Sequence, residues 1–178
     1  MLNNIYQLGQ NNSTLPAENY SHQLSYPSII HQVRYQLQTF EEARKVAYQL
    51  SKYYPSPNRA ETGINELLIN AIEHGNLDIS FEEKQRILQD NAWMNTVYER
   101  LFLLKNKQKK VIVQLEQTPD CITVQIKDQG EGFNWRKFLD NKPGFTPNGR
   151  GIFIARHYAF DTVEYQGNGN HVICRSYL

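Results

Sequence analysis

The sequence predicts an α/β domain, a two-layer sandwich with helices on one face of a mixed, mainly antiparallel sheet. In residues 57–75 the apolar side chains recur at the three- and four-residue spacing of a helix. In residues 111–115 and 122–126 they alternate with polar side chains, which is the pattern of strands. The order of the elements is strand, two helices, a helical segment, and then strands with one interposed helix. This order favours helices packed on one face of a sheet.

The composition is that of a globular protein and excludes several classes of function. The 178 residues suffice for one domain with a real core, and 40% of them are hydrophobic. A net charge of +1 lacks the basic excess of a dedicated nucleic-acid binder. There is no membrane-spanning apolar run, and the N-terminus lacks the features of a signal peptide. Cys121 and Cys174 match no zinc or disulfide pattern. We therefore expect a cytoplasmic protein with reduced thiols, and neither nucleic acid nor membrane as a direct partner.

The first elements are marked by local signals. Residues 1–27 are rich in Asn, Gln, Ser and Tyr without a period, which predicts a flexible N-terminal arm. The near alternation over residues 29–37 predicts an edge strand. Thr39 and Glu42 have capping-box spacing and begin a helix, which must end before Pro55.

The central helix begins with Ser56 as N-cap and Pro57 in its first turn. We expect Gly75 to end it as a C-terminal cap. A second capping box, Ser80 to Glu83, opens a helical insert that we place at about residues 77–104.

The rest of the chain alternates strands with loops. The basic connector 105–110 is expected to be a solvated loop, with attraction of an acidic partner or a phosphate as the alternative. Residues 134–148 have no clear period, and a loop of that length is usually functional or disordered. Gly151 opens a helix to about Tyr158, and strands are expected at residues 161–166 and 171–177.

Polar side chains of the central helix form a possible site. Glu66, Asn70 and His74 are four residues apart and therefore share one helix face. The helix alone is equally compatible with a solvated polar face. In a nucleotide site the Asn70 oxygen could bind Mg²⁺, and Glu66 could polarise an attacking hydroxyl or water.

Two glycine-rich segments favour the nucleotide site. Asp128 ends a buried strand and could accept a hydrogen bond from an exocyclic amine such as that of adenine. Gly130 and Gly132 follow it and permit close approach of the backbone. Gly149, Arg150 and Gly151 precede a helix, where free backbone N–H groups and the Arg charge suit phosphates.

These segments resemble the motifs of a known superfamily, the gyrase, Hsp90, histidine-kinase and MutL ATPases. Residues 66–75 look like its N box, and residues 128–132 and 149–152 look like its two glycine boxes. Residues 73–77 and the insert are most similar to the anti-sigma-factor serine kinases and related ATP-binding domains. The resemblance covers residues 28–178 and implies a Bergerat-type ATP-binding fold.

The resemblance also implies a role for each matching residue. Asn70 would bind Mg²⁺, Glu66 would be the general base, and Asp128 would contact adenine. Residues 134–148 would form the ATP lid. Further nucleotide-binding positions would be Ala71, His74, Gly130, Gly132, Phe133, Gly149, Arg150, Gly151 and Ile152. Two features depart from the family pattern: the second glycine box is short, and the last strand, where many relatives carry a Thr near the adenine, reads Asn170 to Cys174 here without a Thr.

The function implied is phosphorylation of a Ser or Thr on an anti-sigma-factor antagonist, with ATP and Mg²⁺ as cofactors. The alternative is a nucleotide-gated protein-binding module without kinase activity. Other partners implied are a sigma factor or a response-regulator or phosphatase module, and a homodimer is possible. The catalytic domain of a histidine kinase is disfavoured, because His22 and His31 lie in an expected arm and a strand.

Overall fold

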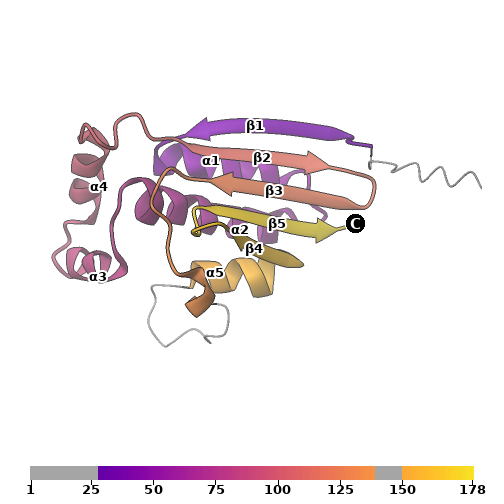
Figure 1. Ribbon diagram of the computed structural model, residues 1–178. Coiled ribbons are helices and arrows are strands. Elements are labelled where there is room, and N and C mark those ends of the chain that lie inside the picture. Colours follow the sequence, from indigo (N-terminus) through magenta and orange to yellow (C-terminus); the bar gives the residue numbers. More distant parts are fainter. Residues whose placement is uncertain (1–27, 139–149) are drawn as a thin grey trace, which may run out of the picture.

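A computed structural model describes residues 28–138 and 150–178 as a two-layer α/β sandwich (Figure 1). The sheet has the strand order β1-β2-β3-β5-β4, and each of these pairings is antiparallel. The strands are β1 His31–Leu37, β2 Val111–Gln117, β3 Cys121–Lys127, β4 Thr162–Gln166 and β5 His171–Tyr177. The predicted fold class is confirmed, although the described strands contain no parallel pair.

Helices cover one face of this sheet, and the insert stands at one of its ends (Figure 1). The regular helices are α1 Phe40–Ser51, α2 Pro57–Asn70, α3 Phe81–Gln89, α4 Trp93–Phe102 and α5 Gly151–Ile154. Two π-helical turns, η1 Ala71–Asn76 and η3 Ala155–Ala159, continue α2 and α5, and η2 Trp135–Phe138 is a 3₁₀ turn. The insert, residues 77–104, contains α3 and α4 as its helices.

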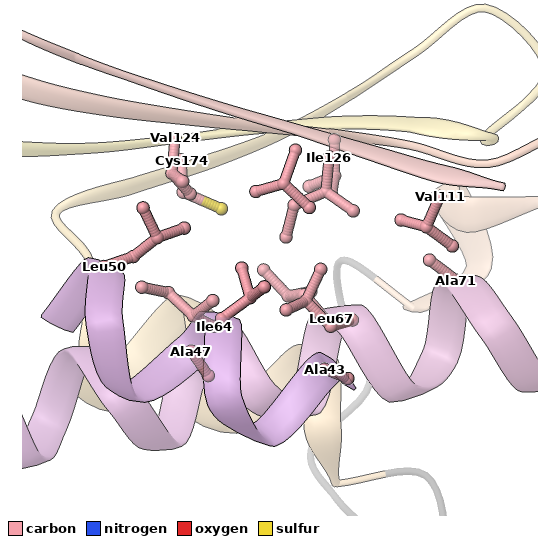
Figure 2. Close-up of a cluster of buried hydrophobic side chains, with 14 of the residues drawn as sticks. Ala43, Ala47, Leu50, Ile64, Leu67, Ala71, Val111, Val124, Ile126 and Cys174 are labelled. Atoms are coloured by element: carbon pink, nitrogen blue, oxygen red, sulfur yellow. The ribbon is translucent and has the colours of Figure 1, made fainter. Parts of the chain in front are cut away.

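The core lies between the sheet and helices α1 and α2 (Figure 2). Alternate residues of β2 and β3 point inward, and the apolar stripes of both helices meet them. Burial of these side chains is the main source of stability, at about 25 cal/mol per Å² of apolar surface. The buried residues predicted from spacing and found in this core are Ala43, Val46, Ala47, Leu50, Ile64, Leu67, Leu68, Ala71, Ile72, Val111, Val113, Leu115, Ile122, Val124 and Ile126.

Helix starts follow the local sequence. The backbone N–H of Glu42 donates to Thr39 Oγ1 and the Thr39 N–H donates to Glu42 Oε2, so the first capping box is complete. In the second box Ser80 Oγ accepts from the Glu83 N–H, but the Glu83 carboxylate pairs with Arg100 instead. The sequence therefore located both helix starts.

The predicted C-terminal cap at Gly75 is wrong. Gly75 lies inside η1, which continues the helix to Asn76. The left-handed residue that follows the helix is Asp78, with φ of 55°. Gly75 is needed for another reason, its packing against the loop after β3, described below.

The basic connector is less solvated than predicted. Lys109 Nζ donates to the backbone oxygen of Asn76 over 3.1 Å, and Lys110 Nζ donates to Gln38 Oε1 over 2.9 Å. These bonds attach the connector to η1 and to Gln38, at the turn between β1 and α1.

Further predictions concern the N-terminal arm, the lid segment, membrane-spanning helices and the two cysteines. The predicted arm, residues 1–27, and residues 139–148 of the segment expected as a lid lie outside the described residues. Across residues 28–138 and 150–178, no helix combines the length and apolar character needed to cross a bilayer. Cys121 and Cys174 are both free thiols.

Substitution Gly63→Ala tests the close packing of α2 on η3. The added methyl would overlap the side chains of Ala159 and Phe160. Overpacking should outweigh the gain in helix propensity, for a net loss of about 1–2 kcal/mol in the free energy of unfolding. Urea unfolding measures this loss, with Gln49→Ala on the exposed face of α1 as control. A Gly63→Ala variant as stable as the wild type would contradict this packing.

Candidate functional site

A cavity of about 360 Å³ opens between α2, η1 and the ends of β3 and β5. Its lining contains most of the residues predicted for a nucleotide, brought together from segments far apart in the sequence. The predicted residues that line it are Asn70, Ala71, His74, Asp128, Gly132, Phe133, Gly151 and Ile152. Leu67, Ile126 and Val172 give it apolar walls, so that it suits a flat, largely apolar group.

A second cavity of about 450 Å³ adjoins the first. The two share Asn70, His74, Phe81 and Gly151 in their linings. The predicted residues Glu66 and Arg150 line only the second cavity. The site therefore has two compartments, one around Asp128 and one around Glu66, joined at Asn70.

Asp128 lies directly after β3 and is 9% exposed. Its backbone N–H donates to Asn170 O, and its Oδ1 accepts from the Gly130 N–H over 2.8 Å. Burial raises the pKa of the Asp128 carboxyl to about 6, although the Gly130 hydrogen bond opposes this. A buried acceptor of this kind suits a ligand that brings its own donor.

Glycines bring η1 and the loop after β3 into contact. A side chain at Gly75 would collide with the Asp128 carboxyl, and one at Gly130 would collide with the backbone of Gly75. Gly130 thus lies behind the cavity wall. Because Gly75 and Gly130 lack side chains, these two segments of the chain can pack closely together. The sequence had instead suggested that Gly130 allows close approach of a ligand.

A second contact closes the other side of this loop. Gly132 has φ of 83°, and a side chain there would collide with Asn168 O. The Phe133 N–H donates to Asn168 O, and Asn168 Nδ2 donates to Glu131 O. The turn between β4 and β5 therefore holds the glycine loop in place.

Three residues of the site were missed by the sequence reasoning. Asn76, 3% exposed, accepts the Gln129 N–H on its Oδ1 over 2.8 Å and joins η1 to the glycine loop. Asn170 Nδ2 donates to Gly130 O, and the ring of Tyr165 lines the first cavity. The sequence did contain a signal for Asn76. It is a polar residue followed by the apolar residues Leu77 and Ile79, which are both buried.

Glu66 and Asn70 meet Gly151 at the start of α5. A methyl group at Gly151 would lie 2.7 Å from Glu66 Oε2 and 3.0 Å from Asn70 Nδ2. Burial raises the pKa of Glu66, and the nearby Lys84 charge opposes this rise. The half-buried Glu66 carboxylate is suited to accepting a proton. It lies beside the Asn70 amide, a group that can bind a metal ion.

His74 is less central than its spacing implied. Its Nδ1–H donates to the Ile79 backbone oxygen over 2.6 Å, and its Nε2 lies 3.3 Å from Glu73 Oε1. The ring still borders both cavities. The two ring nitrogens are thus engaged by Glu73 of η1 and by Ile79, just before α3.

The remaining predicted groups lie at the edges of the site. Phe133 packs edge-on against Tyr165, with ring centroids 5.2 Å apart. Arg150 is exposed and directly precedes α5, whereas Gly149 lies outside the described residues. In the described segments, no three His, Cys, Asp or Glu side chains gather as a metal site, so the predicted Mg²⁺ contact depends on Asn70.

Comparison with known proteins agrees with this geometry. The sequence matches the model of the family described as histidine kinase-like ATPase domain over residues 29–175. The match spans both cavities. No curated protein matches the chain.

Substitution Asp128→Asn tests the burial of this carboxyl. Because the pKa is raised to about 6 from 3.8, folding favours the protonated acid, and this contribution is lost as the pH rises through 6. The uncharged carboxamide of the variant avoids the loss. We expect the variant to be more stable than the wild type at pH 8 by at most about 3 kcal/mol, with the gain shrinking toward pH 4. Urea unfolding across this pH range measures it. The control is Asp120→Asn in the exposed β2–β3 turn, and an equal gain there would contradict the assignment.

Proposed function

The chain belongs to the histidine kinase-like ATPase domain family, and from this premise we propose that it is a regulatory protein kinase. It binds ATP and transfers the terminal phosphoryl group to a Ser or Thr of a partner protein. The partner we propose is an anti-sigma-factor antagonist, and the setting is the cytoplasm. One observation carries the proposal: the Glu66 carboxylate lies in its own compartment, beside Asn70 and Gly151.

The first cavity fits an adenine base. The base is flat and largely apolar on its faces, as are the walls formed by Leu67, Ile126 and Val172. Its exocyclic amine is a donor, and Asp128 is a buried acceptor at the end of the cavity. The cost of burying the Asp128 charge is reduced when such a donor is present.

The junction of the two cavities fits phosphates and a metal ion. Asn70 would hold Mg²⁺ through its side-chain oxygen, with phosphates and waters as the other ligands. When bound, the ion neutralises phosphate charge. Arg150 and the backbone at Gly151, at the opening of α5, supply positive charge and N–H donors on the same side.

Glu66 separates a kinase from a passive binder. Its carboxylate is half-buried, and burial raises its pKa, which makes it a better proton acceptor than an exposed Glu. Asn70 and Gly151 fix its surroundings. In the proposed reaction it orients the partner's hydroxyl and takes its proton, while the rest of the site positions the phosphate.

A nucleotide-gated binding module is the second candidate. The observation in its favour is the insert: its first residues, Asp78 to Phe81, line the nucleotide cavity. A protein bound to the insert would therefore sense the nucleotide directly. A sigma factor, or a response-regulator or phosphatase module, would be a partner of this kind, and a second copy of the chain is a further one.

Substitution Glu66→Gln separates the two candidates. Loss of the base should slow phosphate transfer to a partner by a factor of about 10²–10⁴, while Mg-ATP affinity changes little. Transfer of labelled phosphate and calorimetric binding measure the two quantities.

The control is Glu61→Gln, on the same helix and outside both cavities. Unchanged transfer by Glu66→Gln would overturn the role of Glu66. A wild-type protein that binds Mg-ATP but labels no antagonist would establish the second candidate.

A further inference from the structure

The second cavity contains a cation that the function above does not use. Lys84 belongs to α3 of the insert, and its side chain is 20% exposed. Its Nζ lies 2.8 Å from Glu73 Oε2, and Glu73 is completely buried in η1. A buried ion pair is weak evidence for added stability, because desolvation offsets the attraction. The position of Lys84 therefore calls for an explanation other than added stability.

Lys84 lies in the compartment that does not contain Asp128, the proposed contact of the base. Asp128 lines only the first cavity, and Lys84 lines only the second. A nucleotide with its base at Asp128 must pass Asn70 and Gly151, which border both, before it reaches Lys84. Of its phosphates, the last one extends farthest toward the second cavity.

The charges around Lys84 fit a further anion on this side. Arg44 and Arg150 also line the second cavity, and neither has an ion-pair partner among the described residues. With Lys84 they outnumber the carboxylates of Glu66 and Glu73 in its lining. Lys84 is the least exposed of these cations, so that solvent screens it least.

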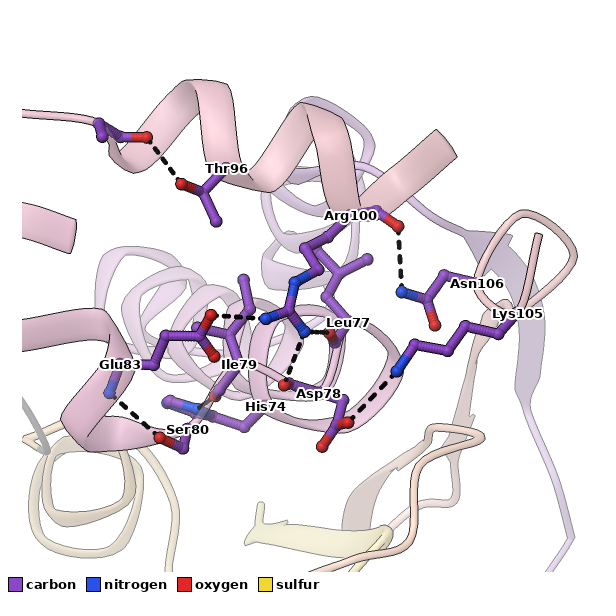
Figure 3. A network of polar contacts seen from close by, with 11 residues as sticks. His74, Leu77, Asp78, Ile79, Ser80, Glu83, Thr96, Arg100, Lys105 and Asn106 are labelled. Carbon is purple, nitrogen blue, oxygen red and sulfur yellow. Dashed lines mark hydrogen bonds and ion pairs between the residues drawn. The ribbon is translucent and has the colours of Figure 1, made fainter. Parts of the chain in front are cut away.

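The contacts of the insert allow a change at Lys84 to affect both of its helices. Figure 3 shows how it is attached: His74 binds Ile79 O, and Arg100 of α4 bonds to the backbone oxygens of Leu77 and Asp78 and to the Glu83 carboxylate. Lys84 Nζ also lies 5.1 Å above the ring of Trp93, the first residue of α4. A change at Lys84 therefore reaches both helices of the insert.

We propose that Lys84 contacts the terminal phosphate and is the residue by which the site distinguishes ATP from ADP. This inference rests on the proposed function. The phosphate competes with Glu73 for the ammonium group, whereas ADP leaves the Lys84–Glu73 pair intact. The insert thereby carries a direct contact to the group that is transferred.

Binding of two nucleotides to Lys84→Gln tests the proposal. The probes are Mg-ADP and the magnesium complex of adenylyl-imidodiphosphate, an ATP analogue that is not hydrolysed, and calorimetry gives each Kd. Loss of a charge-assisted hydrogen bond should weaken the analogue about tenfold or more, and ADP less than about twofold. Lys107→Gln, the same change at an exposed position outside both cavities, should alter neither.

A second pair of variants guards against misfolding, since Lys84→Gln leaves Glu73 buried without its cation. The double variant Glu73→Gln/Lys84→Gln removes both charges and should lose the preference for the analogue. Glu73→Gln alone frees Lys84 and should keep or increase that preference.

Fluorescence provides a readout at the insert. The chain has two tryptophans, so a Trp135→Phe background leaves Trp93 alone. Its emission should change with the analogue and not with ADP, and this difference should vanish with Lys84→Gln.

The outcomes separate the two levels of the argument. A wild-type protein that binds neither nucleotide would overturn the proposed function and this inference together. Binding of both nucleotides with equal affinity, or a Lys84→Gln variant that weakens both to the same degree, would overturn the role of Lys84 alone.

Discussion

The close approach of η1 to the loop after β3 determines the rest of the site. Gly75 faces the Asp128 carboxyl without a side chain between them, and Gly130 packs on the Gly75 backbone. Asn76 adds a hydrogen bond to the Gln129 N–H. These contacts join the helix layer to the sheet at one point, so that Asn70 on α2 and Asp128 after β3 face the same cavity. Any side chain larger than hydrogen at Gly75 or Gly130 would separate the layers there.

The insert is part of the site as well as an addition to the fold. Its first residues line the first cavity, and Lys84 lines the second. The bonds from Arg100 hold α4 against the start of α3. Helix α4 exposes Met94, Tyr98 and Phe102 at four-residue intervals, so the same helix pair lines the second cavity and presents an apolar surface to solvent.

Local signals predicted much of the fold. The capping box at Thr39 and the alternation in β2 and β3 are encoded by neighbouring residues, and each was located from the sequence. Asp128 was placed correctly at the end of a buried strand. The π-helical form of η1 was missed because Ala71 and Ile72 are its only apolar side chains, too few to show a period. Gly75 packs against Asp128, the Asn76 side chain binds Gln129, and Lys84 pairs with Glu73, and no local pattern records these contacts.

The raised pKa of Asp128 has a consequence for the site as a whole. Under the proposed function, an adenine amine favours the ionised carboxylate, which is the stronger acceptor, whereas burial favours the protonated acid up to about pH 6. Nucleotide binding near that pH would then lower the pKa of Asp128 and release protons to the buffer. At moderately acid pH, protons then compete with the base for the carboxyl oxygen atoms of Asp128. The ionisation heat of the buffer becomes part of the apparent binding enthalpy.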